Sequence, residues 1–247
     1  MKKTTRLYVT LAILGASFIC FSSQVAAQNT LSAAEKKAGW YLLFNGQDIN
    51  NFKGYNQDSV PQQWSVKDGA LCFDPTSVKQ DPSKPHHALD LVTKQDYQDY
   101  EFSVEWKISK NGNSGILFNV VENPSWDAPY YSGPEMQVLD NAGHPDARIP
   151  KHRAGDLYDL IKSSSEPAKP YGEWNHVRIV SKNAHYQFFL NDVKINEFTM
   201  HTPEWDKLVA GSKFKAWPQF GKATKGKINL QAHGDKVCYR AIKIRQL

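Results

Sequence analysis

The segment Tyr100–Ile108, with the sequence YEFSVEWKI, decides the fold class because polar and apolar residues alternate along it. A period of two is that of a β-strand with one buried and one solvated face. One face carries Phe102, Val104, Trp106 and Ile108, and the other carries Glu101, Ser103, Glu105 and Lys107. Asn111-Gly112-Asn113 then indicates a turn into a second strand over 114–121.

Further short, aromatic or β-branched runs lie on both sides of this pair. The dipeptides Asp68-Gly69 and Asn191-Asp192 separate such runs and indicate hairpin turns. Helix-like turns are expected around 156–161 and 204–209, and residues 28–38 are expected to form a linker or one loose helical turn. Neither an internal repeat nor a β-α-β alternation is present. The sequence therefore predicts an all-β antiparallel sandwich. The other strands are expected at 39–44, 64–66, 70–73, 89–92, 135–139, 175–180, 186–190, 193–198, 228–231 and 237–244.

The first residues have the form of a signal peptide. Three cations, Lys2, Lys3 and Arg6, precede an apolar run over 7–21, and Val25-Ala26-Ala27 supplies the small residues of a cleavage site after Ala27. A membrane anchor is disfavoured because spanning needs about 20 apolar residues. Lipid attachment at Cys20 is disfavoured by Ile19. We expect a signal peptide over 1–27, a linker over 28–38 and one domain over 39–247, in a periplasmic or secreted protein without a stable membrane span.

Charge and cysteine content exclude some classes of protein. Loss of the three signal-peptide cations lowers the formal net charge from +5 to +2, so nucleic acid is not an expected partner. Cys72 and Cys238 remain in an oxidising compartment, where a disulfide is one alternative. We expect two buried free thiols instead, because a core of this size needs no covalent support.

The segment 133–141, GPEMQVLDN, carries the strongest indication of a site. On a strand, Glu135 and Gln137 share one face while Met136 and Val138 point into the core. A one-residue bulge after Val138 would bring Asp140 to the side of the two polar residues. The three would then line one groove, whereas the alternative is a strand with a merely polar outer face.

Other polar and aromatic residues are weaker candidates. Gln231 and His233 share a strand face, and an imidazole can act as acid or base near neutral pH. Asn113 and Ser114 lie at the rim of a turn, and Lys107 lies on the polar face of its strand. Loops contribute His144 and an aromatic cluster of Trp126, Tyr130 and Tyr131. The rings of this cluster either stack on a sugar or only hold their own loop in place. No zinc signature, serine nucleophile elbow, P-loop or dinucleotide-binding fingerprint is present.

Six segments in order resemble the 3-keto-disaccharide hydrolase family over the whole region from Gly39 to Leu247. The resemblance implies a concanavalin A-like jelly roll, as in lectins and glucanases, with a concave ligand face. It also implies lyase and hydratase steps on 3-keto-glycosides. The segments are WYLLFNG at 40–46, GNSGILF at 112–118, GPEMQVLDN at 133–141, AGDLYDL at 154–160, GEWNHVRI at 172–179 and INLQAHGDKVCYRAIKIRQL at 228–247.

The chain departs from the family pattern at two positions. The family commonly has Leu-Gln-Asp-His-Gly near its end, where this chain has Ala232 in place of the acid. By strand parity Ala232 faces away from His233, so we expect a structural loss rather than a catalytic one. The aromatic residue that commonly separates Glu and Gln is here Met136, which we expect to fill the core.

The implied chemistry needs no nicotinamide, because the substrate already carries a ketone at C3. That ketone acidifies the hydrogen on C2, whose removal expels the substituent on C1, and water then adds back. Glu135 and His233 are the candidate base and acid, in either order. Lys107 or a divalent cation near Asp140 or Glu135 would stabilise the enolate. Expected contacts to the sugar come from Asn113, Ser114, Gln137, Asp140, His144, Gln231, Trp126 and Tyr131.

Two other functions remain open from the sequence. A non-catalytic carbohydrate-binding sandwich would bind sugar without forming product. A conventional glycosidase on the same fold would use a row of acids on the groove strand, but the middle position there is Gln137, which cannot ionise.

Overall fold

The computed structural model describes residues 29–79 and 89–247. The expected signal peptide lies outside these residues, as does part of the loop expected after Phe73. No helix in the described ranges combines the length and the apolar character needed to cross a membrane.

Strands dominate the described chain, and their bounds follow the sequence pattern closely. The strands are β1 Tyr41–Leu42, β2 Phe52–Gly54, β3 Trp64–Lys67, β4 Ala70–Phe73, β5 Leu91–Thr93, β6 Tyr100–Ile108, β7 Asn113–Val120, β8 Glu135–Leu139, β9 Asn175–Lys182, β10 His185–Leu190, β11 Val193–Thr199, β12 Lys227–Leu230 and β13 Val237–Gln246. The helical elements are α2 Ala33–Lys37, α3 Pro203–Ala210 and the 3₁₀ turns η2 Pro129–Tyr131, η3 Pro145–Arg148 and η4 Lys213–Ala216.

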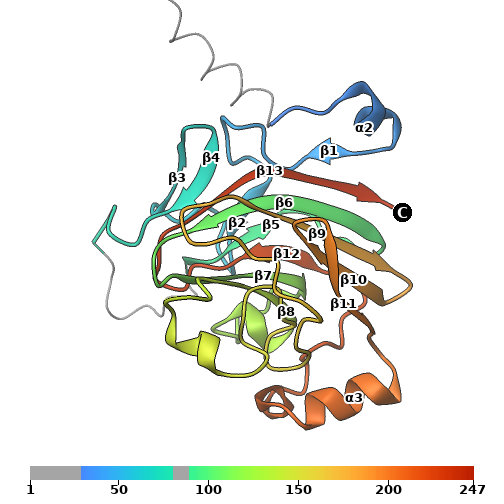
Figure 1. Cartoon of the computed structure of the whole chain (residues 1–247). Helices are drawn as coiled ribbons and strands as arrows, with labels where there is room; N and C mark the ends of the chain where they lie inside the picture. The colour runs from blue at the N-terminus through green and yellow to red at the C-terminus, as the bar shows by residue number, and fades with distance from the viewer. Residues whose placement is uncertain (1–28, 80–88) are drawn as a thin grey trace, which may run out of the picture.

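The strands of the described ranges form two antiparallel sheets of eight and five strands (Figure 1). The large sheet has the order β11-β10-β9-β6-β13-β4-β3, with β1 paired to β13. The small sheet has the order β2-β5-β12-β7-β8. This arrangement confirms the predicted all-β jelly-roll sandwich.

The core lies between the two sheets, where their apolar faces meet. On β6, Phe102, Val104 and Trp106 are at most 1% exposed, as the alternation predicts. Phe118 of β7 packs across the sandwich against Phe188 of β10, with ring centroids 5.7 Å apart. Glu101, on the other face of β6, is also buried. Its charge is compensated because Arg178 and Arg245 donate to its carboxylate at 3.1 and 2.8 Å.

The predicted hairpin turns are present. Asp68 and Gly69 have φ of 50° and 71° between β3 and β4. Asn191 and Asp192 have φ of 48° and 66° between β10 and β11. Two successive residues with positive φ match the twist of antiparallel strands, which explains why Asn, Asp and Gly occupy these positions.

Two local features differ from the expectation. Around 156–161 the chain makes a single turn, in which the Leu157 carbonyl accepts from the Leu160 and Ile161 N–H groups at 2.9 Å, but this turn does not extend into a helix. Leu157 also bridges to Met136. The short strand β2 carries no strong sequence pattern and was not expected. Within residues 28–38, the helical alternative is the one that forms: Ser32 and Glu35 make a capping box that starts α2.

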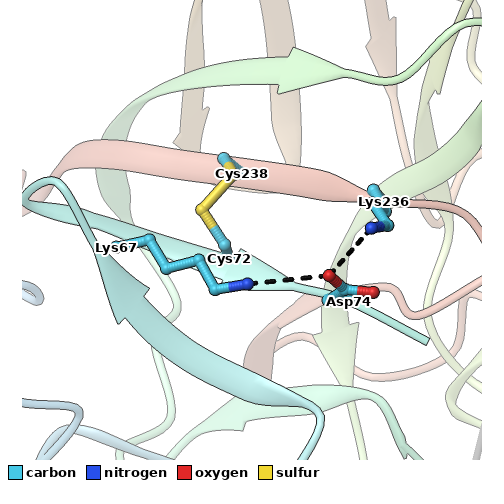
Figure 2. The surroundings of a disulfide bond; sticks show 5 residues. All are labelled: Lys67, Cys72, Asp74, Lys236 and Cys238. Carbon is cyan, nitrogen blue, oxygen red and sulfur yellow. Dashed lines mark ion pairs between the residues drawn. A yellow bond between two sulfur atoms is a disulfide. The ribbon is translucent and has the colours of Figure 1, made fainter. Parts of the chain in front are cut away.

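The expectation of two free thiols is also wrong. Cys72 and Cys238 face each other across β4 and β13 and form a disulfide over 166 residues of sequence (Figure 2). Beside it, Asp74 lies between Lys67 and Lys236 at 3.6 and 2.9 Å. Antiparallel pairing of the two strands brings the cysteines together, whatever the size of the core.

Candidate active site

A pocket of about 410 Å³ lies against the small sheet. Met136 and Val138 are buried in the core, so the alternate residues Glu135 and Gln137 point from the opposite face of β8 into this pocket. Its volume is typical of a small-molecule site. The lining residues are Asn113, Tyr130, Glu135, Gln137, Tyr158, Lys213, Phe214, Trp217, Gln231, Ala232 and His233.

Glu135 forms the floor of the pocket and is 6% exposed. Its side chain crosses the backbone of β7 at Gly115, where an added Cβ would lie 2.0 Å from Glu135 Oε1. With its amide nitrogen turned toward Glu135, Gln137 donates to the same oxygen at 3.0 Å and to the Ser114 carbonyl at 3.2 Å. A glycine and an amide thus fix the direction of the carboxyl group.

Burial raises the pKa of Glu135 to about 8. The Lys213 ammonium and a hydrogen bond from Gln231 oppose this rise, while Asp90 and Asp146 add to it. Glu135 therefore carries its proton at neutral pH and is poised to donate it. Such a value near the working pH is what acid–base catalysis requires.

The segment after the η3 turn folds onto the free edge of β8 and supplies one wall. The Gln137 N–H donates to Asp156 O at 3.0 Å, and in return the Gly155 N–H donates to Gln137 O at 2.9 Å. The Tyr158 N–H donates to Glu135 O at 2.9 Å, which places the phenol beside the carboxyl group. This pairing satisfies an edge strand that would otherwise be open.

Lys213 supplies the cation of the pocket lining. Its ammonium lies 4.1 Å from the centroid of the Tyr158 ring, and its backbone N–H donates to Asp159 Oδ2 at 3.0 Å. The ring holds the ammonium at the pocket, where its charge lowers the pKa of Glu135. A cation beside an acid can stabilise negative charge that develops on a bound substrate.

Comparison with known proteins identifies the family. Residues 39–245 match the 3-keto-alpha-glucoside-1,2-lyase-like domain. The chain belongs to this family. A 3-keto-disaccharide hydrolase of Bacteroides thetaiotaomicron is 32% identical, over 92% of this chain and 84% of that protein.

Solved structures share the fold of this chain. A crystal structure from Parabacteroides distasonis, provisionally named a glycosyl hydrolase, superimposes with a TM-score of 0.80 and 31% identity, covering 89% of this chain and 99% of that one. A second structure from the same organism and with the same provisional name has a TM-score of 0.61 and 26% identity, over 84% and 99% of the two chains.

The structure brings together five of the residues that the sequence singled out. Glu135 and Gln137 come from β8, Asn113 from β7, and Gln231 and His233 from the segment that follows β12. Gln231 is 7% exposed, whereas His233 is exposed at the rim. One pocket thus holds a buried carboxyl group, an imidazole and three amides in this member of the 3-keto-α-glucoside-1,2-lyase-like family.

The expectation for Lys107 is corrected. The residue does lie on the polar face of β6, but β6 belongs to the large sheet. Its ammonium lies 4.8 Å from the centroid of the Trp174 ring, and Arg240 covers the same ring at 4.0 Å. Lys213 takes its place as the cation of the pocket.

Three polar candidates have structural roles outside the pocket. β8 pairs with β7 in register through Leu139 without the expected bulge, and Asp140 accepts from the N–H groups of Asn111 and Ala142 at 2.8 and 3.1 Å. Ser114 is buried and donates to Gln231 O at 2.7 Å. His144 accepts from the Asp146 N–H at 3.2 Å and caps η3.

Of the three aromatic candidates, Tyr130 lines the pocket. Trp126 and Tyr131 contact each other with ring centroids 6.4 Å apart, but neither lines the pocket. Trp217, which was not a candidate, lines the pocket beside Tyr130, and the two ring centroids lie 5.2 Å apart. The segment that holds Lys213 and Trp217 has no regular sequence pattern, so its contribution was missed.

The expectation that Ala232 faces away from His233 is also wrong. β12 ends at Leu230, so strand parity does not extend to these residues, and both line the pocket. The Ala232 N–H donates to Asp90 Oδ1 at 2.7 Å. Asp90 is 1% exposed, and burial raises its pKa to about 8 despite hydrogen bonds from Ala232 and Asn229.

The sequence left open a divalent cation near Asp140 or Glu135. Within residues 29–79 and 89–247, no three His, Cys, Asp or Glu side chains are grouped so that they could hold a metal ion. We therefore assign no residue to metal binding.

The two buried acids predict how stability depends on pH. The pKa values of Asp90 and Glu135 rise on folding from about 4 to about 8, so the folded state binds more protons between these values. The contribution of these two groups to the free energy of unfolding is fully present below pH 4 and is lost as the pH rises toward 8. The free energy of unfolding should therefore fall with pH by up to about 1.4 kcal/mol per pH unit for each group, and we expect an Asp90→Asn variant to lose the part that is due to Asp90.

Urea unfolding at pH 5, 6, 7 and 8 would measure this effect, with Asp96→Asn on the exposed surface as the matched control. A difference in unfolding free energy between the wild-type protein and Asp90→Asn that stays constant over this range would contradict the prediction.

Proposed function

We propose that the protein is a carbohydrate-active enzyme that cleaves 3-keto-glycosides by elimination followed by hydration, with net hydrolysis of the glycosidic bond. The observation that carries the proposal is the buried Glu135 in one pocket with His233 and Lys213. Membership of the 3-keto-α-glucoside-1,2-lyase-like family and a relative named a 3-keto-disaccharide hydrolase support it.

In the elimination step, His233 removes the proton from C2 of the sugar. The electrons of the C2–H bond form the enolate of the C3 ketone, and the Lys213 ammonium stabilises its negative charge. The C1–O bond then breaks, a C1–C2 double bond forms, and Glu135 gives its proton to the leaving oxygen. Asn113, Gln137 and Gln231 bind hydroxyl groups of the sugar.

In the hydration step, the same two groups act in reverse. Ionised Glu135 takes a proton from a water molecule while the oxygen of that water bonds to C1. Protonated His233 then returns a proton to C2. The product is a 3-keto sugar, and both residues recover their starting protonation states. One acid and one base therefore suffice for both steps.

We further propose that the protein is exported to the periplasm or secreted. The sequence over 1–27 has the form of a cleavable signal peptide. The Cys72–Cys238 disulfide supports the proposal, because such bonds persist in oxidising compartments.

The test is turnover of a 3-keto-glycoside in D₂O, beside the corresponding ordinary glycoside. The His233 imidazole is exposed and exchanges its proton with solvent, so elimination and rehydration place deuterium on C2 of the released sugar, whereas direct hydrolysis leaves hydrogen there. We expect cleavage of the ketone substrate only, with deuterium at C2 in the 3-keto sugar that is first released. The 3-keto sugar incubated with enzyme controls for exchange after release.

Cleavage of the ordinary glycoside at a comparable rate, or a C2 position that keeps its hydrogen, would reject the elimination mechanism. Binding of the sugar without product would support a carbohydrate-binding module instead. A conventional glycosidase is less favoured, because it needs two carboxyl groups and Glu135 is the only one among the described residues that line the pocket.

The role of Lys213 predicts two changes in a Lys213→Met variant. We expect kcat to fall at least tenfold, because the enolate loses its nearest cation. The Lys213 ammonium lowers the pKa of Glu135, so its loss should move the alkaline fall in kcat/KM to higher pH. Lys213→Arg keeps the positive charge, so its kcat/KM should fall at the same alkaline pH as that of the wild-type protein. Coinciding pH–rate profiles for the wild-type protein and both variants would refute the proposed role of Lys213.

The contact between Gly115 and Glu135 predicts loss of activity on adding a single methyl group. A Gly115→Ala variant forces the Glu135 carboxyl group out of position, and we expect kcat/KM to fall about 100-fold. Gly211→Ala is the matched control, because its new Cβ would meet only backbone oxygens at 3.5 and 3.6 Å. Full activity in a folded Gly115→Ala protein would show that the position of Glu135 is unimportant.

A further inference from the structure

One wall of the pocket is aromatic and has no part in the proton transfers. It consists of Tyr130, Phe214 and Trp217, which we call the aromatic wall. Tyr130 comes from η2, and Phe214 and Trp217 come from η4 and the residue after it. Two loops that are distant in sequence therefore build one apolar surface beside the acid–base groups.

The aromatic wall is held rigidly by rings behind it. Trp217 contacts Tyr130, Tyr131 and Phe214, with centroids 5.2, 5.4 and 5.7 Å apart. Phe214 is 2% exposed and stacks on Phe220 at 3.9 Å with an interplanar angle of 4°. A preformed surface of this kind loses little entropy when a ring stacks on it.

The carboxyl group and two of the amides are buried more deeply than Tyr130 and Trp217 of the aromatic wall. Glu135, Gln137 and Asn113 are 6%, 1% and 3% exposed, whereas Tyr130 and Trp217 are only half-buried. The buried amides and the carboxyl group need hydroxyl and carbonyl partners, so the oxidised sugar belongs on the floor. The substituent on C1 then extends outward past Tyr130 and Trp217.

We propose that the aromatic wall is a leaving-group subsite that selects 3-keto-glycosides of aromatic alcohols. This inference rests on the proposed function and specifies its substrate class. The alcohol released by cleavage of the C1–O bond carries a flat ring, which stacks on Trp217 and Tyr130 until it departs.

The chemistry of the aromatic wall favours an aromatic ring over a second sugar. A second sugar would bring several hydroxyl groups, each of which loses water on binding and needs a hydrogen-bond partner. The side chains of the wall offer only the Tyr130 hydroxyl and the Trp217 indole N–H. An aromatic alcohol has a single oxygen, which Glu135 serves.

The test compares benzyl and methyl 3-keto-α-glucosides, whose alcohols have similar acidity but differ by one aromatic ring. We expect the wild-type protein to favour the benzyl substrate about tenfold in kcat/KM, and Trp217→Leu to reduce this ratio to about one. Trp174→Leu is the matched control on the large sheet and should keep the ratio. Tyr130→Leu should reduce the ratio as well and serves as the second variant.

Two kinetic results would overturn the proposal. One is a benzyl-to-methyl ratio that survives in folded Trp217→Leu and Tyr130→Leu proteins. The other is a 3-keto-disaccharide whose turnover falls as much as that of the benzyl substrate in Trp217→Leu, which would assign the wall to sugar rings.

A binding measurement separates failure of this inference from failure of the proposed function. Quenching of tryptophan fluorescence by unoxidised benzyl α-glucoside, but not by methyl α-glucoside, would show stacking on the wall without any turnover. We expect this difference to disappear in Trp217→Leu and to persist in Trp174→Leu. Equal quenching by both glucosides in the wild-type protein would reject the subsite even if 3-keto-glycosides are cleaved.

Discussion

A Glu135→Gln variant is expected to lose a factor of about 10² to 10⁴ in kcat on a 3-keto-glycoside. The amide keeps the size of the side chain, but it can neither protonate the leaving oxygen nor deprotonate water. In the wild-type protein, kcat/KM should fall as the pH rises through about 8, because the elimination needs the protonated form of Glu135. Steady-state kinetics between pH 5 and 10 would measure both effects.

The matched control is Glu105→Gln on the large sheet, where Glu105 binds Arg240 at 2.6 Å. It should leave kcat unchanged. Glu135→Gln should fold normally, because Gln137 and Gln231 can still bind the oxygen of the new amide. Wild-type turnover in a folded Glu135→Gln protein would remove Glu135 from the mechanism, whatever the fate of the other assignments.

The fold follows from short-range patterns that the sequence displays directly. The alternation over Tyr100–Ile108 and Glu135–Leu139 gives β6 and β8 with the same bounds. The same alternation places Glu135 and Gln137 away from the core. These inferences succeed because strand parity depends only on neighbouring residues and on which face is buried.

Assignment of residues to one sheet or the other requires long-range information. Glu135 and Lys107 both lie on polar strand faces, and parity treats them alike. β8 ends the small sheet, whereas β6 lies inside the large one, so the two faces are on different sides of the sandwich. A single sequence does not state strand order, and this explains the error for Lys107.

The loops are the least predictable part of the site. Lys213 and Trp217 lie in an irregular segment with neither period two nor period 3.6. They reach the pocket because Lys213 packs on Tyr158 and Trp217 packs on Tyr130. Tyr158 itself lies in the segment AGDLYDL, which carried part of the family resemblance. That segment was the available indication that a residue after β8 contributes to the site.

The disulfide was mispredicted for a related reason. Cys72 and Cys238 lie 166 residues apart, and only the register of β4 against β13 makes them direct neighbours. The argument from core size concerned whether the fold needs a covalent bond, which does not decide whether two thiols meet. In an oxidising compartment, adjacency is sufficient for the bond to form.

Removal of the Cys72–Cys238 disulfide is expected to destabilise the protein by about 3–5 kcal/mol. A bond that closes a loop of 166 residues restricts the unfolded chain strongly, because the entropy lost on closure grows with the logarithm of loop length. A Cys72→Ala, Cys238→Ala variant should therefore unfold roughly 10 °C below the wild-type protein. Urea unfolding and thermal denaturation would measure the difference.

The reducing agent dithiothreitol provides the control for lost side-chain packing. It should lower the unfolding temperature of the wild-type protein toward that of the double variant and leave the variant unchanged. Neither cysteine contacts the pocket on the small sheet, so kcat of the folded double variant should match that of the wild-type protein. A difference in unfolding free energy below about 1 kcal/mol between the wild-type protein and the double variant would contradict the prediction. Strand pairing alone would then hold β4 against β13, and the disulfide would add little.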